Sequence, residues 1–143
     1  MPLYRIAGQV DIERGIAQAA ITPTPGDWPP YEPNTVVFVF ESADPLLTLK
    51  RFALPIAESR NINVNGFVYL LEIEDTKGII KQDESQNGWD GSLVHFGPIP
   101  INGISVMGDI CVIESRGTFK RFNEPRIYRN TIPLSGFKIR GNQ

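Results

Sequence analysis

The sequence has one cysteine, Cys111, and one histidine, His95, among its 143 residues. A single cysteine cannot form an intrachain disulfide, so the disulfide-rich secreted scaffolds are excluded. A single histidine excludes metal sites with two imidazole ligands and leaves one imidazole base for catalysis. Both residues lie in apolar stretches, "GDICVIES" and "SLVHFGP". We therefore interpret Cys111 as a small buried side chain and His95 as a structural histidine.

Long apolar runs are also missing. None approaches the roughly 20 residues that a membrane-spanning helix needs. The start of the chain, "MPLYRIAGQV", lacks the charged segment followed by an apolar segment that marks a signal peptide. We therefore predict a protein that is made in the cytoplasm without a secretion signal and has no membrane partner.

The common catalytic signatures are absent: the sequence contains no GxSxG, HExxH, CxxC or GxxxxGK[ST] motif. Glu72 and Glu74 are two residues apart and share a strand face, but an exposed polar edge accounts for them. We predict no catalytic residues, no cofactor and no enzymatic activity. A small enzyme would need a site assembled from residues that lie far apart in the chain.

Turn-forming residues, by contrast, are abundant, with 13 glycines and 12 prolines. Apolar alternation between the turn signals predicts about eight or nine strands. The fold prediction is mainly β: a single domain, residues 1–143, forming an antiparallel β-sandwich, jelly roll or compact β-barrel. Five prolines from Pro23 to Pro33 mark residues 22–34 as a proline-rich arm.

Two segments fit either a helix or a strand. Residues 11–20 show a helical stripe that Gly15 weakens, and residues 46–54 fit a short helix between two prolines. Farther along, "FVYLLEIED" and "GIIKQ" are separated by a short link and predict a hairpin. Alternation is clearest in two strands, where it places on one face Phe67, Tyr69, Leu71 and Ile73, and on another Ile104, Val106, Ile110 and Val112.

The segment "KQDESQNGWDGS", residues 81–92, matches the first half of a calcium-binding loop, D-x-S-x-N-G, starting at Asp83. The twelfth position, where a bidentate glutamate should close the site, is Val94. We therefore predict no metal and regard Asp83, Asn87 and Asp90 only as weak candidate ligands. A solvated hairpin turn is favoured for this segment.

Three aromatic side chains lie on predicted loops beside polar residues: Trp28 and Tyr31 in the arm, and Trp89 next to Asp90. Exposed loop aromatics often bind ligands, so a glycan platform is one interpretation. Packing back onto the fold, or burial at an interface, is the other. A carbohydrate- or small-ligand-binding β-sandwich that uses these aromatics is the alternative functional hypothesis.

The net charge of −2 conceals an uneven distribution. Residues 1–115 carry seven Lys or Arg against fifteen Asp or Glu, a balance of −8, whereas residues 116–143 carry seven against one, a balance of +6. The basic residues Arg121, Arg126 and Arg129 would contact either the acidic body of a second copy or acidic strands of their own chain. Nucleic acid is disfavoured as a partner because the chain as a whole is acidic.

These features favour a non-enzymatic structural protein that acts through protein–protein contacts, as a homo-oligomer or within a larger assembly. A virion component, such as a capsid-decorating or tail protein, is an example of this class that no motif specifies. A contact between basic and acidic regions of successive copies would be head-to-tail and would close into rings or extend into a lattice. The predicted ligand or interface residues are Trp28, Tyr31, Trp89, Asp90, Arg121, Arg126 and Arg129.

Overall fold

The computed structural model describes residues 2–26, 28–74, 76–85, 89 and 91–139. The strands in these ranges are β1 (Leu3–Gly8), β2 (Ala20–Ile21), β3 (Val36–Phe40), β4 (Phe67–Ile73), β5 (Ile79–Gln82), β6 (Ser92–Phe96), β7 (Ile99–Pro100), β8 (Ile104–Arg116), β9 (Phe119–Phe122) and β10 (Arg126–Pro133). The helices are α1 (Gln9–Gln18) and α2 (Pro45–Ser59), with 3-10 turns η1 (Ile101–Gly103) and η2 (Leu134–Gly136). None of the described helices is long and apolar enough to cross a membrane.

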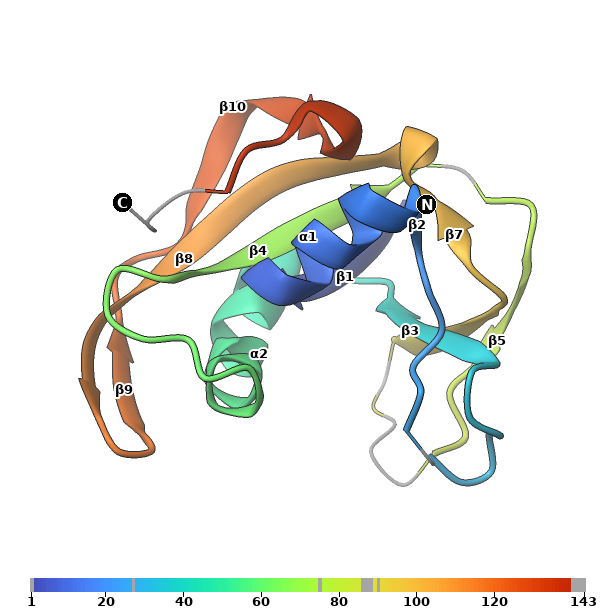
Figure 1. The fold of residues 1–143 in the computed structure, drawn as a ribbon, viewed down its shortest axis with the longest axis horizontal. Coiled ribbons are helices and arrows are strands. Elements are labelled where there is room, and N and C mark those ends of the chain that lie inside the picture. The colour runs from blue at the N-terminus through green and yellow to red at the C-terminus, as the bar shows by residue number, and fades with distance from the viewer. Residues whose placement is uncertain (1, 27, 75, 86–88, 90, 140–143) are drawn as a thin grey trace.

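One eight-stranded antiparallel sheet organises the fold. Its order is β10-β8-β4-β1-β3-β6-β5, and β9 pairs with β8 beside this path. β2 and β7 form a separate two-stranded ladder. Figure 1 shows β10 and β5 at opposite ends of the molecule. The mainly β, antiparallel prediction is confirmed, but the described strands form an open sheet instead of the predicted sandwich, jelly roll or barrel.

Each face of this sheet is covered by a helix. Tyr69 of β4 packs in the cluster that contains Ile12 of α1, whereas the next residue, Leu70, packs in the cluster that contains Leu49 of α2. Successive residues of a strand point to opposite faces, so the two helices lie on opposite sides. Figure 1 shows α1 in front of the sheet. The helices occupy the layers that a second sheet would take in a sandwich, which is why that prediction fails.

The first ambiguous segment, residues 11–20, is helical up to Gln18. Asp11 supports the helix start, because its carboxylate accepts a hydrogen bond from the backbone N–H of Gly8 at 3.3 Å. Gly15 lies where α1 approaches β2. A Cβ on Gly15 would be 2.9 Å from Cδ1 of Ile21, so the glycine that weakens the helical pattern is needed for packing.

The second ambiguous segment is also helical, and α2 runs past its predicted end. Asp44 caps the helix, since its Oδ1 accepts from the N–H of Leu47 at 3.1 Å, and Pro45 suits the first helical position. Pro55 lies inside the helix on its exposed side, whereas Ala57 beyond it is fully buried. Packing of the buried face continues the helix although a proline donates no backbone hydrogen bond.

The predicted hairpin between β4 and β5 does not form. β4 pairs with β1 and β8 in the middle of the sheet, whereas β5 pairs with β6 at its end. The hairpin is therefore β5–β6, and residues 83–91 of the "KQDESQNGWDGS" segment lie between its strands. Residues 137–139 follow η2 without strand structure.

A bulge in β8 reverses its alternation. The pairing of β8 with β4 shifts register between Leu70 and Leu71. As a result, Val106 packs with the α1 side of the sheet and Ile110 with the α2 side. The prediction that Ile104, Val106, Ile110 and Val112 share one face is wrong, because one extra residue in a strand moves all later side chains to the other face.

Candidate functional site

β5 is an edge strand, and all four of its residues are exposed. The exposed fraction is 64% for Ile79 and 37% for Ile80, and it is 36% for Phe96 on the neighbouring strand β6. Nζ of Lys81 lies 5.8 Å from the centre of the Phe96 ring, within cation–π range. An apolar edge of this kind is a template for a further strand.

Backbone geometry shows which groups line this edge. The N–H of Asp83 donates to the carbonyl of Ser92 at 3.1 Å, so the odd-numbered residues of β5 face β6. In an antiparallel ladder, the backbone groups of successive residues alternate between the two sides of the strand. Ile80 and Gln82 therefore direct their N–H and C=O groups away from β6, whereas the N–H of Gly78 donates to the Thr76 hydroxyl at 3.3 Å.

The proline-rich arm closes one end of the edge. The Tyr31 hydroxyl donates to the carbonyl of Gln82 at 3.4 Å and accepts from the N–H of Glu84 at 2.8 Å. Its ring lies edge-on to Phe38 and Phe96, with ring centres 6.3 Å apart in both pairs. The arm is thus held against its own sheet, and the open part of the edge is limited to residues 78–82.

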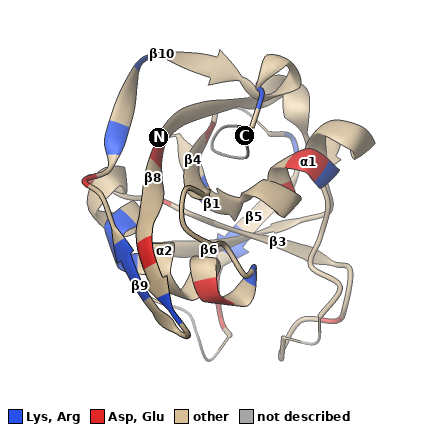
Figure 2. Cartoon of the chain, turned by 60° about the vertical axis from the view of Figure 1, so that its left-hand side comes forward, with Lys and Arg blue, Asp and Glu red and all other residues tan. Residues whose placement is uncertain are grey.

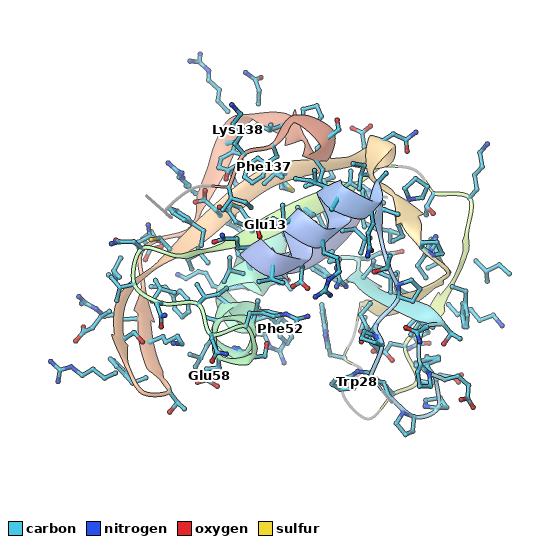
Figure 3. The ribbon with its side chains drawn as sticks, in the orientation of Figure 1. Glu13, Trp28, Phe52, Glu58, Phe137 and Lys138 are labelled. Atoms are coloured by element: carbon cyan, nitrogen blue, oxygen red, sulfur yellow. The ribbon has the colours of Figure 1, made fainter. Side chains whose placement is uncertain are left out.

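The two tryptophans pack against the same face of β3. The ring centres of Trp28 and Phe38 are 6.0 Å apart, and Trp28 remains 40% exposed; Figure 3 shows it on the arm. Trp89 lies 5.6 Å from Phe40 and is stacked on Phe52 of α2 at 5.1 Å. Phe52 covers one face of the Trp89 indole, so that face cannot carry a sugar.

A buried histidine fixes the start of β5. His95 is 1% exposed, and Nδ1 donates to the carbonyl of Gly97 at 2.9 Å. Nε2 forms a hydrogen bond with the Thr76 hydroxyl at 2.5 Å. Gly78 lies against the ring, and a Cβ there would fall far inside van der Waals contact with Nε2. Both ring nitrogens are used within the fold, in agreement with a structural histidine.

Among the weak candidate metal ligands, Asn87 and Asp90 lie outside the described residues. The carboxylate of Asp83 accepts from the N–H of Ser85 and from the hydroxyl of Ser92, both at 2.8 Å. The described part of the chain contains no group of three or more His, Cys, Asp or Glu placed to hold a metal ion. Asp83 anchors the loop to the start of β6.

A buried carboxylate on β8 holds β10. Asp109 is 1% exposed, and its two oxygens accept from Nε and Nη2 of Arg126 at 2.9 and 3.0 Å. The Tyr128 hydroxyl donates to Asp109 Oδ2 at 2.5 Å. This cluster lies where β10 shifts register against β8, between Ile127 and Ile132. Arg126, predicted as an interface residue, is thus bonded within its own chain.

The environment of Asp109 changes the acidity of two tyrosines. Burial raises the pKa of Tyr128, and the hydrogen bond to the Asp109 carboxylate raises it further. Burial and the charge of Asp109 also raise the pKa of Tyr69. A phenol whose folded pKa exceeds its unfolded pKa of about 10 keeps its proton longer in the folded state. Its contribution to stability is fully present below about pH 10 and is lost as the pH rises.

We therefore expect the free energy of unfolding to fall as the pH rises above about 10. Tyr128→Phe removes one of these titrations, so the slope of the unfolding free energy against pH should be shallower in the variant. Urea-unfolding curves at a series of pH values measure both slopes. Equal slopes in wild type and variant would contradict the expected role of Tyr128.

The other predicted arginines lie near β9 and β10. Figure 2 shows basic residues gathered on β9 beside acidic residues of β8. Nε of Arg121 lies 3.3 Å from Oε2 of Glu114, and Arg129 is exposed in the register-shifted part of β10. Arg121 and Arg126 therefore pair within the chain, with Glu114 and Asp109. The intrachain interpretation expected other partners, the acidic residues in and directly after β4, Glu72 and Glu74.

Comparison of the chain with protein-family models, with curated proteins and with solved structures found no match.

The sequence does not predict Ile79 and Ile80 as site residues. An apolar pair in a strand predicts burial, and only the strand order shows that β5 lies at the end of the sheet. One signal was available, because Lys77 and Lys81 flank the pair and charged residues are typical of edge strands.

Proposed function

We propose that this protein is a non-enzymatic structural component that acts through protein–protein contacts, first of all with copies of itself. The observation that carries this proposal is the open edge of β5, where Ile79 is 64% exposed and the backbone groups of Ile80 face outward. Proteins that stay monomeric normally protect such an edge. A capsid-decorating or tail protein of a virion is one setting in which a contact of this kind would serve.

The opposite end of the sheet is protected, which singles out β5. β10 carries the charges of Arg126 and Arg129 and ends at Pro133, which donates no backbone hydrogen bond. It also leaves the regular ladder between Ile127 and Ile132. These are devices that keep edge strands from pairing. Since the basic residues also pair within the chain, the β5 edge supports self-association better than a head-to-tail contact between charged regions.

Sedimentation velocity over a range of protein concentrations, at low and high salt, tests the proposal. We expect the mass to rise with concentration and to change little with salt, because an apolar strand edge depends less on screened charges than an ionic contact does. A strong loss of association at high salt would favour the head-to-tail contact. A wild type that stays monomeric at the highest concentration would overturn self-association.

A further inference from the structure

We propose that two copies of this chain pair through β5 in an antiparallel, two-fold arrangement in which Ile80 lies opposite Ile80 of the second copy. The two sheets would then join into one continuous sheet. This inference rests on the proposed function and names its partner and contact surface: a second copy, through residues 78–82.

Symmetry limits the registers that such a pair can adopt. Residues directly opposite each other in an antiparallel pair point to the same face of the sheet. If the two copies are related by a two-fold axis perpendicular to the joined sheet, opposing side chains point to the same face only when one residue lies opposite its own copy. The pair is therefore centred on a single residue of the strand, and each choice of centre gives a different set of opposing side chains.

Charge excludes two of these centres. A pair centred on Ile79 would place Lys77 opposite Lys81 at both ends, and a pair centred on Lys81 would place that lysine opposite itself. Like charges directly opposite each other are destabilising. A pair centred on Ile80 instead places Ile79 opposite Lys81, and Lys77 opposite Asp83, so the charges at its two ends are complementary.

Tyr31 excludes a third centre. A pair centred on Gln82 would place Lys81 opposite Asp83, which is also complementary in charge. That register, however, needs the N–H of Glu84, which already donates to the Tyr31 hydroxyl at 2.8 Å, whereas the pair centred on Ile80 does not use this group. Among the four centres from Ile79 to Gln82, the centre on Ile80 agrees with both the charges and the arm.

The backbone of β5 suits this centre. The backbone groups of Ile80 and Gln82 face outward, so Ile80 of each copy would exchange two N–H···O=C hydrogen bonds with Ile80 of the other. The N–H of Gln82 would donate to the carbonyl of Gly78 in the second copy. On one face the two Ile80 side chains would meet at the axis. On the other face Ile79 would lie beside the stem of the opposing Lys81, so both exposed isoleucines would leave water.

Single cysteines test the register. Position 80 lies opposite its own copy in the proposed pair, whereas position 79 lies opposite position 81. Ile80→Cys should therefore be cross-linked by a short bis-maleimide several-fold faster than Ile79→Cys or Lys81→Cys. A mixture of Ile79→Cys and Lys81→Cys should be cross-linked faster than either alone. Wild type is the control for Cys111, which is buried. Equal rates at positions 79, 80 and 81 would overturn the register.

A matched pair of lysine substitutions tests the surface. Ile80→Lys places a charge opposite itself at the axis and should raise the dissociation constant of the pair roughly tenfold or more. Ile132→Lys on β10 is the control, because Ile132 is 38% exposed and Ile80 37%. Ile132→Lys should leave the dissociation constant near the wild-type value. Both variants should keep a melting temperature close to that of wild type.

The outcomes separate the two proposals. If wild type associates but Ile80→Lys associates equally well, the β5 contact is wrong and self-association stands through another surface. If Ile132→Lys weakens association instead, the contact lies on β10. If wild type remains monomeric at all concentrations, both the β5 pair and the proposed self-association are overturned.

Discussion

Arg126→Ala is expected to lower the free energy of unfolding by about 3 kcal/mol. The substitution leaves the carboxylate of Asp109, which is 1% exposed, without the two hydrogen bonds that the guanidinium donates. Breaking a buried ion pair from one side typically costs about 3–5 kcal/mol. We expect the lower end of this range because the Arg126 side chain is 46% exposed, so water can replace part of what it donates. Urea unfolding measures the change.

Arg129→Ala is the matched control for this prediction. Arg129 lies on the same strand and carries the same charge, but its side chain is exposed. Its removal should change the free energy of unfolding by no more than about 0.5 kcal/mol. Replacing Asp109 by Asn together with Arg126→Ala should recover part of the loss, since the buried charge is then gone. Equal effects of Arg126→Ala and Arg129→Ala would show that the ion pair does not hold β10.

Because Arg126 is paired with Asp109, a charge reversal of the basic C-terminal region would alter the stability of the fold as well as any contact between copies. Reversing Arg121, Arg126 and Arg129 together to Glu would set a second carboxylate against buried Asp109. The expected result is a less stable monomer, whatever surface the protein uses for association. A test of the charged surface should therefore keep Arg126 and reverse the exposed Arg129.

Strand positions in this fold could be predicted where burial follows a simple period. The stretch "TVVFVF" predicts a strand that is buried on both faces, and β3 lies inside the sheet between β1 and β6. In β4, Tyr69, Leu71 and Ile73 share a face as their spacing predicts. The apolar run of β3 and the alternation in β4 are both local patterns, so local sequence is enough to predict which faces of these strands are buried.

Strand partners could not be predicted in the same way. A period of two indicates a strand and its buried face but does not identify its neighbours. The short link between β4 and β5 suggested a hairpin, yet the two strands lie in different parts of the sheet. The single extra residue in β8 is likewise invisible in the pattern, although it moves Ile110 to the opposite face from Val106.

Candidate site residues could likewise be identified from the sequence, but their contacts could not. The sequence identifies Trp28, Tyr31 and Trp89 as loop aromatics. It does not predict that all three pack against β3, as they do in the structure. The partner of Arg126 lies 17 residues away in the sequence, on an adjacent strand. Because pairing of strands creates that contact, charge counting could find the arginine but not what it bonds.

Gly78→Ala is expected to lower the free energy of unfolding by roughly 1–3 kcal/mol. The added methyl group would overlap Nε2 of His95, and this ring is 1% exposed and cannot move into solvent without losing its own bonds. Either the ring shifts and its hydrogen bond with Thr76 breaks, or the start of β5 moves away from β6. Thermal or urea unfolding measures the loss of stability.

Gly136→Ala is the control, since a Cβ on Gly136 would meet no atom within 4 Å. It should change stability by no more than about 0.5 kcal/mol. Hydrogen exchange then locates the effect of Gly78→Ala, because the N–H groups of Ile79 and Lys81 face β6 and exchange faster if the strand loosens. Normal protection of both amides in Gly78→Ala, with stability unchanged, would mean that the packing of Gly78 on His95 does not set the position of β5. The outward direction of Ile80, on which the pairing of two copies depends, would then need another structural cause.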